Sequence, residues 1–191
     1  LGALTAGLLR YCEQHNLPVP LIDAVELDPE RARKAKESVS HPHVNIHCSD
    51  FLAAEHNLGD YDLVIGNPPY IAITSIEEID KLDFRARFTT AYGRFDLYFL
   101  FFERALDLLR ADGRLVFITP EKFLKVWSAQ ALRLILDQHW VESVDFLPEN
   151  TFDGYTTYPV VTSVRKGNHG GTTKVTPRDL AAPREVLLPI G

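Results

Sequence analysis

The sequence predicts an α/β fold in which a doubly wound, mostly parallel sheet carries helices on both faces. Short apolar runs that indicate strands alternate along the chain with segments of helical periodicity. The chain has 191 residues, of which 46% are apolar and 24% charged, which is typical of one globular domain. Ligands of such sheets bind outside the carboxyl ends of the strands. We therefore expect functional residues just after the predicted strands.

The expected elements follow from local patterns of apolar and turn-forming residues. Apolar positions recur at helical spacing over residues 3–15, and Pro29 opens a basic helix where its missing N–H costs little. The apolar run 61–66 stops at two consecutive prolines, and an Asp-Gly turn follows the apolar helix 96–110. In chain order we expect a helix over 3–15, a strand over 21–27, a helix from Pro29, strands over 43–47 and 61–66, a helix over 96–110, a strand over 114–119, a helix over 121–138, a strand over 141–147 and a final strand over 158–164.

Composition limits the class of protein further. No apolar run approaches the roughly 20 residues that span a bilayer, so we expect no membrane partner. Cys12 and Cys48 are too few for a disulfide framework or a zinc site. We interpret them as reduced residues of a cytoplasmic protein and expect no metal. The formal net charge of −6 is unusual for a nucleic-acid-binding protein, but the distribution of charge matters more than its sum.

The two ends of the chain differ from its middle. Leu1 starts inside an apolar segment and the chain has no methionine, so we expect the domain to begin upstream. From Gly167 the sequence is rich in Gly, Thr and Pro, which is typical of a linker or the edge of another domain. We therefore expect one domain over residues 1–166, followed by a linker or the start of a second domain over residues 167–191.

Three positions suit an adenosine-containing cofactor. Gly2 precedes a helix, where a glycine allows close approach of a ligand, although many such glycines only form a turn. Glu26 ends the strand 21–27, where a carboxylate can accept from ribose hydroxyls or simply face solvent. Asp50, followed by Phe51, comes after the next strand and can accept from an adenine amino group or open a turn. Their order along the chain predicts an adenosyl cofactor more strongly than any one residue does.

The most specific signal is the segment Asn67-Pro68-Pro69-Tyr70, directly after the strand 61–66. Two prolines stiffen the backbone and remove two donors, which leaves carbonyl oxygens free to accept. Asn67 adds a side-chain carbonyl and Tyr70 an aromatic ring. A planar substrate with an NH2 group fits, because one N–H can donate to the Asn67 side chain and the other to the Pro68 carbonyl. The alternative is an ordinary Asn-Pro turn.

This arrangement predicts methyl transfer to an amino nitrogen. Two hydrogen bonds that hold both N–H groups direct the nitrogen lone pair toward a methyl sulfonium. No strong general base is needed with an activated sulfonium, so catalysis rests on orientation and electrostatics. We expect Tyr70 to stack on the substrate ring.

An NPPY segment after an apolar strand resembles the signature of amino-group methyltransferases. From Gly2 to about Lys166 the chain resembles the catalytic domain of gamma-class N6-adenine-specific DNA methyltransferases of restriction–modification systems, in which the cofactor residues precede NPPY. The resemblance implies the Rossmann-like fold of class I S-adenosylmethionine-dependent methyltransferases, S-adenosyl-L-methionine as cofactor, and Asn67 beside that cofactor. In this family a strand and a loop of small residues precede the position of Leu1, and a target-recognition domain follows the catalytic one.

Two further segments fit this family. Asp96 and Tyr98 open the apolar helix and resemble the segment that lines the pocket between cofactor and base, although a capping Asp and a core aromatic have the same pattern. Phe152 matches the aromatic residue that contacts the extruded base. Tyr155 and Tyr158 compete with it for that role.

The resemblance implies methylation of the N6 amino group of an adenine flipped out of double-stranded DNA, with a cognate restriction endonuclease as a further partner. RNA base methyltransferases and release-factor glutamine methyltransferases are alternatives with the same chemistry, and the glutamine enzymes often have Ile after NPPY, as at Ile71. The chain lacks their Phe-Glu-Pro-like element, whereas its long apolar helix and the loop around Phe152 favour the DNA enzymes. A further alternative is a module that binds DNA or a partner and has no activity. The presence of all three of Asn67, Pro68 and Tyr70 argues against it.

Overall fold

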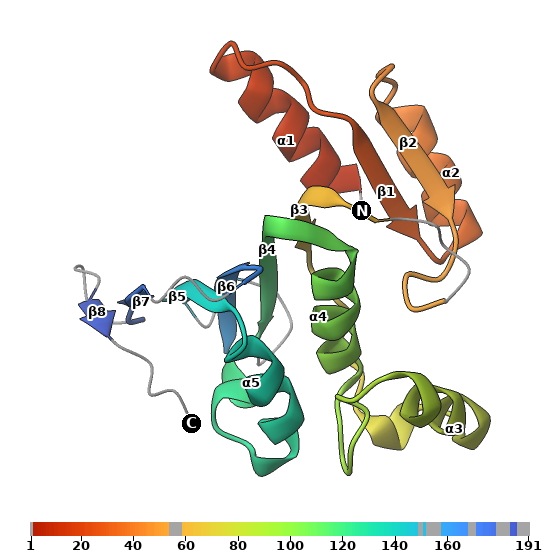
Figure 1. The fold of residues 1–191 in the computed structure, drawn as a ribbon. Helices are drawn as coiled ribbons and strands as arrows, with labels where there is room; N and C mark the ends of the chain where they lie inside the picture. The colour runs from red at the N-terminus through yellow and green to blue at the C-terminus, as the bar shows by residue number, and fades with distance from the viewer. Residues whose placement is uncertain are drawn as a thin grey trace. The chain divides into compact units, whose positions relative to one another are not determined.

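A computed structural model describes residues 2–53, 59–148, 151, 158–167, 171–178 and 184–186. The chain divides into two compact units, unit 1 over Leu1–Asn57 and unit 2 over Leu58–Gly191. Each unit has its own β-sheet (Figure 1). Within the described ranges, every helix is too short or too polar to cross a membrane.

Unit 1 has a two-stranded parallel sheet. Asp28 starts its second helix, because the Asp28 carboxylate accepts a hydrogen bond from the backbone N–H of Arg31 at 2.8 Å and Pro29 occupies the first turn. The strands pair in register, with Glu26 opposite Cys48, so both end at the same edge. The elements are α1 (Gly2–Gln14), β1 (Ile22–Glu26), α2 (Pro29–Ser38) and β2 (Val44–Cys48).

Unit 2 has a six-stranded sheet in the order β3-β4-β6-β5-β7-β8. Its strands are β3 (Tyr61–Gly66), β4 (Leu109–Pro120), β5 (Trp140–Phe146), β6 (Pro159–Arg165), β7 (Thr173–Thr176) and β8 (Arg184–Val186). Its helices are α3 (Glu78–Arg87), α4 (Leu97–Leu108) and α5 (Gln130–Leu136), with 3-10 turns η1 (Ile73–Ser75), η2 (Glu121–Leu124) and η3 (Trp127–Ala129).

The sheet of unit 2 is mixed. Strands β3, β4, β5 and β7 run in the same direction, so most of its strands are parallel to one another, as the sequence predicts. Strand β3 runs parallel to β4, and β7 runs parallel to β5. Strand β6 lies antiparallel between β4 and β5, and β8 is antiparallel to β7.

The core of unit 2 lies between α4 and the sheet. Helix α4 packs against β4 (Figure 1), and its Phe99 and Phe102 are completely buried. The ring of Phe102 meets Phe117 of β4 edge to face, with 5.1 Å between the ring centroids. Each fully buried aromatic side chain contributes about 2–3 kcal/mol through removal of apolar surface from water. This packing holds α4 in a fixed position behind the strands that carry the candidate site.

The segment after β4 differs from the predicted elements. We expected one helix over 121–138, but η2, η3 and the short α5 occupy that range. The guanidinium of Arg133 donates to the backbone carbonyls of Phe123 at 2.8 Å and of Val126 at 2.7 Å. A continuous helix would use those carbonyls as acceptors for its own N–H groups, so Arg133 stabilises the interruption.

Two further features were absent from the prediction. Helix α3 lies between the NPPY segment and α4, in a range to which we had assigned no element. Strand β7 pairs with β5, so the sheet continues past Gly167, where the sequence indicated a linker or another domain. With four residues, β7 is too short for its alternation of polar and apolar side chains to stand out in the sequence.

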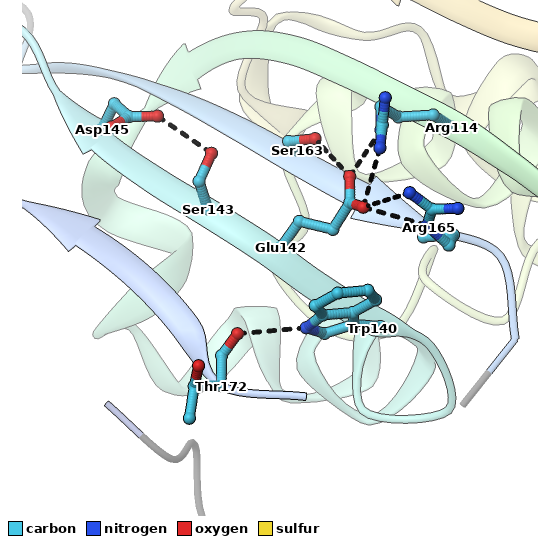
Figure 2. Close-up of polar contacts among 8 residues, drawn as sticks. All are labelled: Arg114, Trp140, Glu142, Ser143, Asp145, Ser163, Arg165 and Thr172. Carbon is cyan, nitrogen blue, oxygen red and sulfur yellow. Dashed lines mark hydrogen bonds and ion pairs between the residues drawn. The ribbon is translucent and has the colours of Figure 1, made fainter. Parts of the chain in front are cut away.

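Glu142 of β5 connects three neighbouring strands (Figure 2). Its carboxylate accepts from Arg114 of β4 at 2.5 and 2.9 Å, and from Arg165 of β6 at 2.9 Å. Ser163 of β6 donates to it at 3.1 Å. The hydrogen bonds from Arg114 are the main reason that the pKa of Glu142 is lowered to about 2, although burial opposes the shift. The side chain is only 15% exposed, so this charge depends on its cationic partners.

We expect Glu142→Gln to lower the free energy of unfolding near neutral pH by on the order of 2 kcal/mol, a value that allows for solvent screening at the partly exposed Arg114. The folded-state pKa lies below the ordinary value of 4.5, so the contribution of Glu142 is present above that pH and is lost as the pH falls toward about 2. Urea unfolding across this window should therefore show the difference between the two proteins shrink. Glu13→Gln, at an exposed position of α1, is the control. A difference that did not change with pH would contradict the assignment.

Candidate functional site

The predicted catalytic segment begins where β3 ends beside β4. Gly66, the last residue of β3, lies opposite Phe117. A Cβ atom on Gly66 would lie 2.9 Å from Cε1 of the buried Phe117, so glycine lets β3 end close to its neighbour. Pro68 is buried and Asn67 is exposed. The Asn67 amide is therefore presented at the carboxyl edge of this sheet.

The hydroxyl of Tyr70 restrains the Asn67 side chain. It lies 2.6 Å from Oδ1 of Asn67 and 3.2 Å from the backbone oxygen of Ile118 on β4. Its single proton serves one acceptor at a time, and the Asn67 contact is the shorter. Burial raises the pKa of Tyr70 to about 12, so the hydroxyl keeps its proton at neutral pH. Tyr70 therefore connects the NPPY segment to the end of β4 as a neutral donor.

A short antiparallel contact brings the start of α4 to this segment. The backbone N–H of Leu97 donates to the carbonyl of Ile71 at 2.8 Å, and the N–H of Ile73 donates to the carbonyl of Phe95 at 3.1 Å. Asp96 and Tyr98 therefore lie close to Tyr70, as their predicted roles require. The rings of Tyr70 and Tyr98 meet edge to face, with centroids 6.3 Å apart.

Tyr98 lies behind Tyr70 in the core. Its side chain is completely buried, and burial, followed by the charge of Asp96, raises its pKa. A phenol that is neutral and buried here supports the ring of Tyr70. Direct contact of Tyr98 with a substrate stays a prediction.

Asp96 forms an ion pair in place of a helix cap. It occupies the N-cap position of α4, but its side chain makes no capping hydrogen bond. Its Oδ2 atom lies 2.7 Å from Nζ of Lys122, which follows β4. The Asp96 side chain is 10% exposed and the Lys122 side chain 48%. The sequence analysis missed Lys122, although its position after a predicted strand was an available signal.

A cleft of about 270 Å³ opens beside this ion pair. Apolar side chains of Ile73, Phe95 and Val126 line it together with polar ones, and the charge of Lys122 is matched by that of Asp96. Its walls include Ala72, Thr74, Arg94, Asp96, Lys122 and Ser128.

In unit 1, two predicted cofactor residues lie at the same edge of the sheet. Glu26 ends β1, its carbonyl accepts from the N–H of Ser49 at 3.0 Å, and Asp50 follows directly. One carboxylate oxygen of Glu26 accepts from the N–H of Asp28 at 3.2 Å, and one of Asp50 accepts from Leu52 at 2.9 Å, which forms the turn that the alternative interpretation expects. Each carboxylate keeps a second oxygen for another donor. This pair of acceptors fits the hydroxyl and amino donors of an adenosine.

Gly2 lies at a different place in unit 1. A Cβ atom on Gly2 would lie 3.6 Å from Oγ of Ser38, the last residue of α2. Helix α2 begins next to Glu26, and its 10 residues extend about 15 Å. A cofactor role for Gly2 stays a prediction.

The remaining predicted residues are only partly placed. Phe51 is half-buried directly after Asp50. Phe152 and its competitor Tyr155 lie outside the described residues, whereas Tyr158 is 42% exposed. Asn67 belongs to unit 2 and the other cofactor residues to unit 1, so its contact with the cofactor stays a prediction.

Comparison with known proteins gives a family. Residues 13–152 match the Eco57I restriction-modification methylase family. The chain is 34% identical over 114 residues to the type II restriction enzyme and methyltransferase RM.Eco57I of Escherichia coli, covering 57% of this chain and 11% of that protein. It is 36% identical over 125 residues to the type II methyltransferase M.XhoI of Xanthomonas vasicola, covering 62% of this chain and 22% of that protein. The chain thus spans less than a quarter of these two relatives.

A third relative methylates RNA according to its name. The chain is 32% identical over 138 residues to a tRNA1(Val) (adenine(37)-N6)-methyltransferase of Salmonella arizonae, covering 70% of this chain and 53% of that protein.

Solved structures share the fold. A putative class I S-adenosylmethionine-dependent methyltransferase from Listeria monocytogenes has a TM-score of 0.72 at 17% identity, covering 91% of this chain and 54% of that one. The methyltransferase subunit of a type I restriction-modification system from Streptococcus thermophilus has a TM-score of 0.62 at 20% identity, covering 79% of this chain and 35% of that one.

The fold is that of the class I S-adenosylmethionine-dependent methyltransferases, as the sequence predicted. The chain belongs to the Eco57I restriction-modification methylase family. Methyl transfer is the activity that this family indicates, with S-adenosylmethionine as the cofactor.

We expect Lys122→Met to lower the free energy of unfolding by about 1–2 kcal/mol, because it leaves the buried Asp96 carboxylate without a cation. Asp96→Asn in the same protein should recover part of the loss, since no unpaired charge then remains. Urea unfolding of the wild type, both single variants and the double variant gives the coupling free energy. The exposed pair of Arg33 and Glu37, each 61% exposed, is the control, with an expected coupling of only about 0.3–0.5 kcal/mol. Equal coupling in the two pairs would contradict a buried role for Asp96.

Proposed function

We propose that the protein transfers the methyl group of S-adenosylmethionine to the N6 amino group of an adenine extruded from double-stranded DNA. The observation that carries the proposal is the exposed Asn67 amide at the end of β3, held by the hydroxyl of Tyr70. Its family membership supports a modification enzyme of a restriction–modification system.

Asn67 and Pro68 supply the acceptors. A carbonyl oxygen has two lone pairs, so Oδ1 of Asn67 can accept from Tyr70 and still accept one N–H of the substrate amino group. The Pro68 carbonyl takes the second N–H, because the prolines leave the local backbone short of donors. With both hydrogens held, the nitrogen lone pair points out of the ring plane toward the electrophile. Orientation then replaces a general base.

Tyr70 holds the acceptor in place and faces the adenine ring. Its edge-to-face contact with Tyr98 and its hydroxyl contacts fix the plane of the phenol. A fixed ring can stack on an extruded base, and such stacking returns about 1–3 kcal/mol of the unstacking cost. Tyr70 remains neutral because burial raises its pKa to about 12, so it cannot compete as a base.

Glu26 and Asp50 are the residues that we assign to the cofactor. When bound, S-adenosylmethionine supplies an activated methyl group on a positively charged sulfur. The free carboxylate oxygen of Glu26 suits the ribose hydroxyls, and that of Asp50 suits the adenine amino group. We assign Gly2, Phe51 and Asn67 to cofactor binding on the basis of the family resemblance.

We also propose double-stranded DNA and a cognate restriction endonuclease as partners. The name of RM.Eco57I combines a restriction enzyme with a methyltransferase, whereas M.XhoI is named as a methyltransferase alone. A nuclease on the same polypeptide or on a separate one is compatible with these relatives. We place Phe152 and Asp96 in the pocket for the target base by resemblance, and we expect the protein in the cytoplasm with that DNA.

RNA is the second candidate substrate, because the tRNA1(Val) (adenine(37)-N6)-methyltransferase matches 70% of this chain. The same amino-group chemistry applies to adenine in either nucleic acid. RM.Eco57I and M.XhoI have slightly higher identities, at 34% and 36% against 32%, and the matching family is one of restriction-modification methylases, which favours DNA.

Expression of the full-length protein in a host without adenine methylation should produce N6-methyladenine in the host DNA, measured by mass spectrometry after digestion to nucleosides. Asn67→Ala should lower the signal by about 10²–10³-fold, since it removes an oriented acceptor. Tyr70→Phe should lower it less than Tyr70→Ala, because the ring remains while the hydroxyl is lost. RNA from the same cells is analysed in parallel. Methyladenine in RNA but not in DNA, again dependent on Asn67, would replace the DNA assignment with the RNA one.

Glu26→Ala should weaken binding of S-adenosylmethionine by about 10- to 100-fold, because the ribose hydroxyls lose a charged acceptor. Isothermal titration calorimetry measures this directly and does not depend on the methyl acceptor. Glu30→Ala, at an exposed position in the first turn of α2, is the control and should bind like the wild type. Equal affinities in all three proteins would remove Glu26 from the cofactor site.

A further inference from the structure

Two large aromatic side chains lie together on the surface of unit 2. Tyr92 is 65% exposed and Trp127 is 69% exposed, and their ring centroids are 6.3 Å apart with an interplanar angle of 60°. They come from segments 35 positions apart in the chain. Two tilted rings that touch each other cannot shield both ring faces, so apolar ring surface remains in contact with water.

Both rings are displayed by well-anchored segments. The backbone N–H groups of Thr89 and Thr90 donate to the carboxylate of Glu103 at 2.9 and 2.8 Å, and the following Ala91 is 2% exposed. Tyr92 comes next, so its backbone starts from a fixed point. Aromatic rings held in this way lose little conformational entropy when a ligand stacks on them.

The backbone of Trp127 is also held in place. It starts the turn η3, which ends at the fully buried Ala129. The preceding turn is held by Arg133, whose guanidinium donates to the carbonyls of Phe123 and Val126. The exposed indole is therefore not the result of a loose loop.

The surroundings of the two rings are basic. Arg94 is exposed two residues after Tyr92, and Lys122 and Lys125 precede Trp127, with Lys125 70% exposed. Lys122 and Lys125 are each paired with a carboxylate, Asp96 and Glu121, which are 10% and 15% exposed, so the excess positive charge is that of Arg94. This local excess of exposed positive charge contrasts with the net charge of −6 of the whole chain.

The rings adjoin the candidate site. Arg94, Lys122 and Ser128 line the same cleft as Asp96 and Ala72, and the last of these comes two residues after Tyr70. Tyr92 and Trp127 are chain neighbours of these lining residues. A ligand in this cleft can therefore also meet the aromatic pair.

We propose that Tyr92 and Trp127 form a stacking platform for a DNA base next to the target adenine, with Arg94 contacting the adjoining phosphate. Aromatic rings with flanking cations are the combination that binds single-stranded nucleic acid, because bases stack on the rings and phosphates meet the cations. Extrusion of the target adenine leaves bases without their normal neighbours, and such bases have an open π-face. This assignment rests on the proposed action on DNA.

The probe for this proposal is a short, fluorescein-labelled single-stranded oligodeoxyadenylate, whose binding to the full-length protein is measured by fluorescence anisotropy. Trp127→Ala and Tyr92→Ala should each raise Kd by about 5- to 150-fold, the range expected for loss of one stacked base. Trp127→Phe should retain most of the affinity. Tyr11→Ala, at a tyrosine of unit 1 that is 54% exposed, is the matched control and should leave Kd unchanged.

Salt dependence separates stacking from phosphate contact. Arg94→Gln should reduce the slope of log Kd against log salt by about 0.7, the value for one phosphate contact on a single strand. Trp127→Ala should leave that slope unchanged. Thermal unfolding of all variants should match the wild type, because both rings are exposed, so a loss of binding cannot be ascribed to unfolding.

Methylation of DNA by the same proteins distinguishes failure of this proposal from failure of the proposed function. We expect Trp127→Ala to raise the KM for DNA and to leave kcat close to the wild-type value. If the wild-type protein methylates DNA and both aromatic variants have unchanged Kd and KM, the platform is overturned and the proposed function stays intact. A protein partner would then be the better occupant of the two rings. A wild-type protein that neither binds nor methylates DNA would overturn both.

Discussion

The candidate site depends on the parallel pairing of β3 with β4. In a parallel pair both strands end at the same edge, so the residues that follow β3 meet those that follow β4. Gly66 allows this approach, because any larger residue would press on Phe117. The hydroxyl of Tyr70 then lies between Asn67 and the carbonyl of Ile118, one residue beyond Phe117. Without this pairing, NPPY would be a stiff loop with no fixed orientation.

Two carboxylates of unit 2 with little exposure to solvent are matched by cations from other elements. Asp96 before α4 faces Lys122 after β4, and Glu142 of β5 faces Arg114 of β4 and Arg165 of β6. A buried charge is costly unless it is paired, so each pair penalises arrangements in which the elements shift. The two pairs act at different places. Glu142 connects neighbouring strands, whereas Asp96 connects the start of α4 to the cleft beside Tyr70.

The interruption of the helix after β4 determines which side chains are exposed in this segment. Arg133 uses its guanidinium to satisfy carbonyls that a continuous helix would have satisfied internally. The break directs Trp127 toward solvent and leaves Lys122 beside Asp96. Local periodicity predicts one helix over this range, because a side chain that reaches back over several residues leaves no periodic signal. Sequence reasoning therefore missed the break in the helix and the exposed position of Trp127 that results from it.

The sequence by itself determined the class of fold, the NPPY segment and the order in which the candidate cofactor and catalytic residues occur. These follow from local signals, namely alternating apolar runs, a Pro-Pro stop after a strand and an acidic residue at a strand end. Only the tertiary structure decided that β6 lies reversed between β4 and β5, that Asp96 pairs with Lys122 and that Gly2 lies beside Ser38. Each of these is a contact between residues distant in sequence, and such contacts are chosen by packing and charge compensation across elements, which no local pattern records.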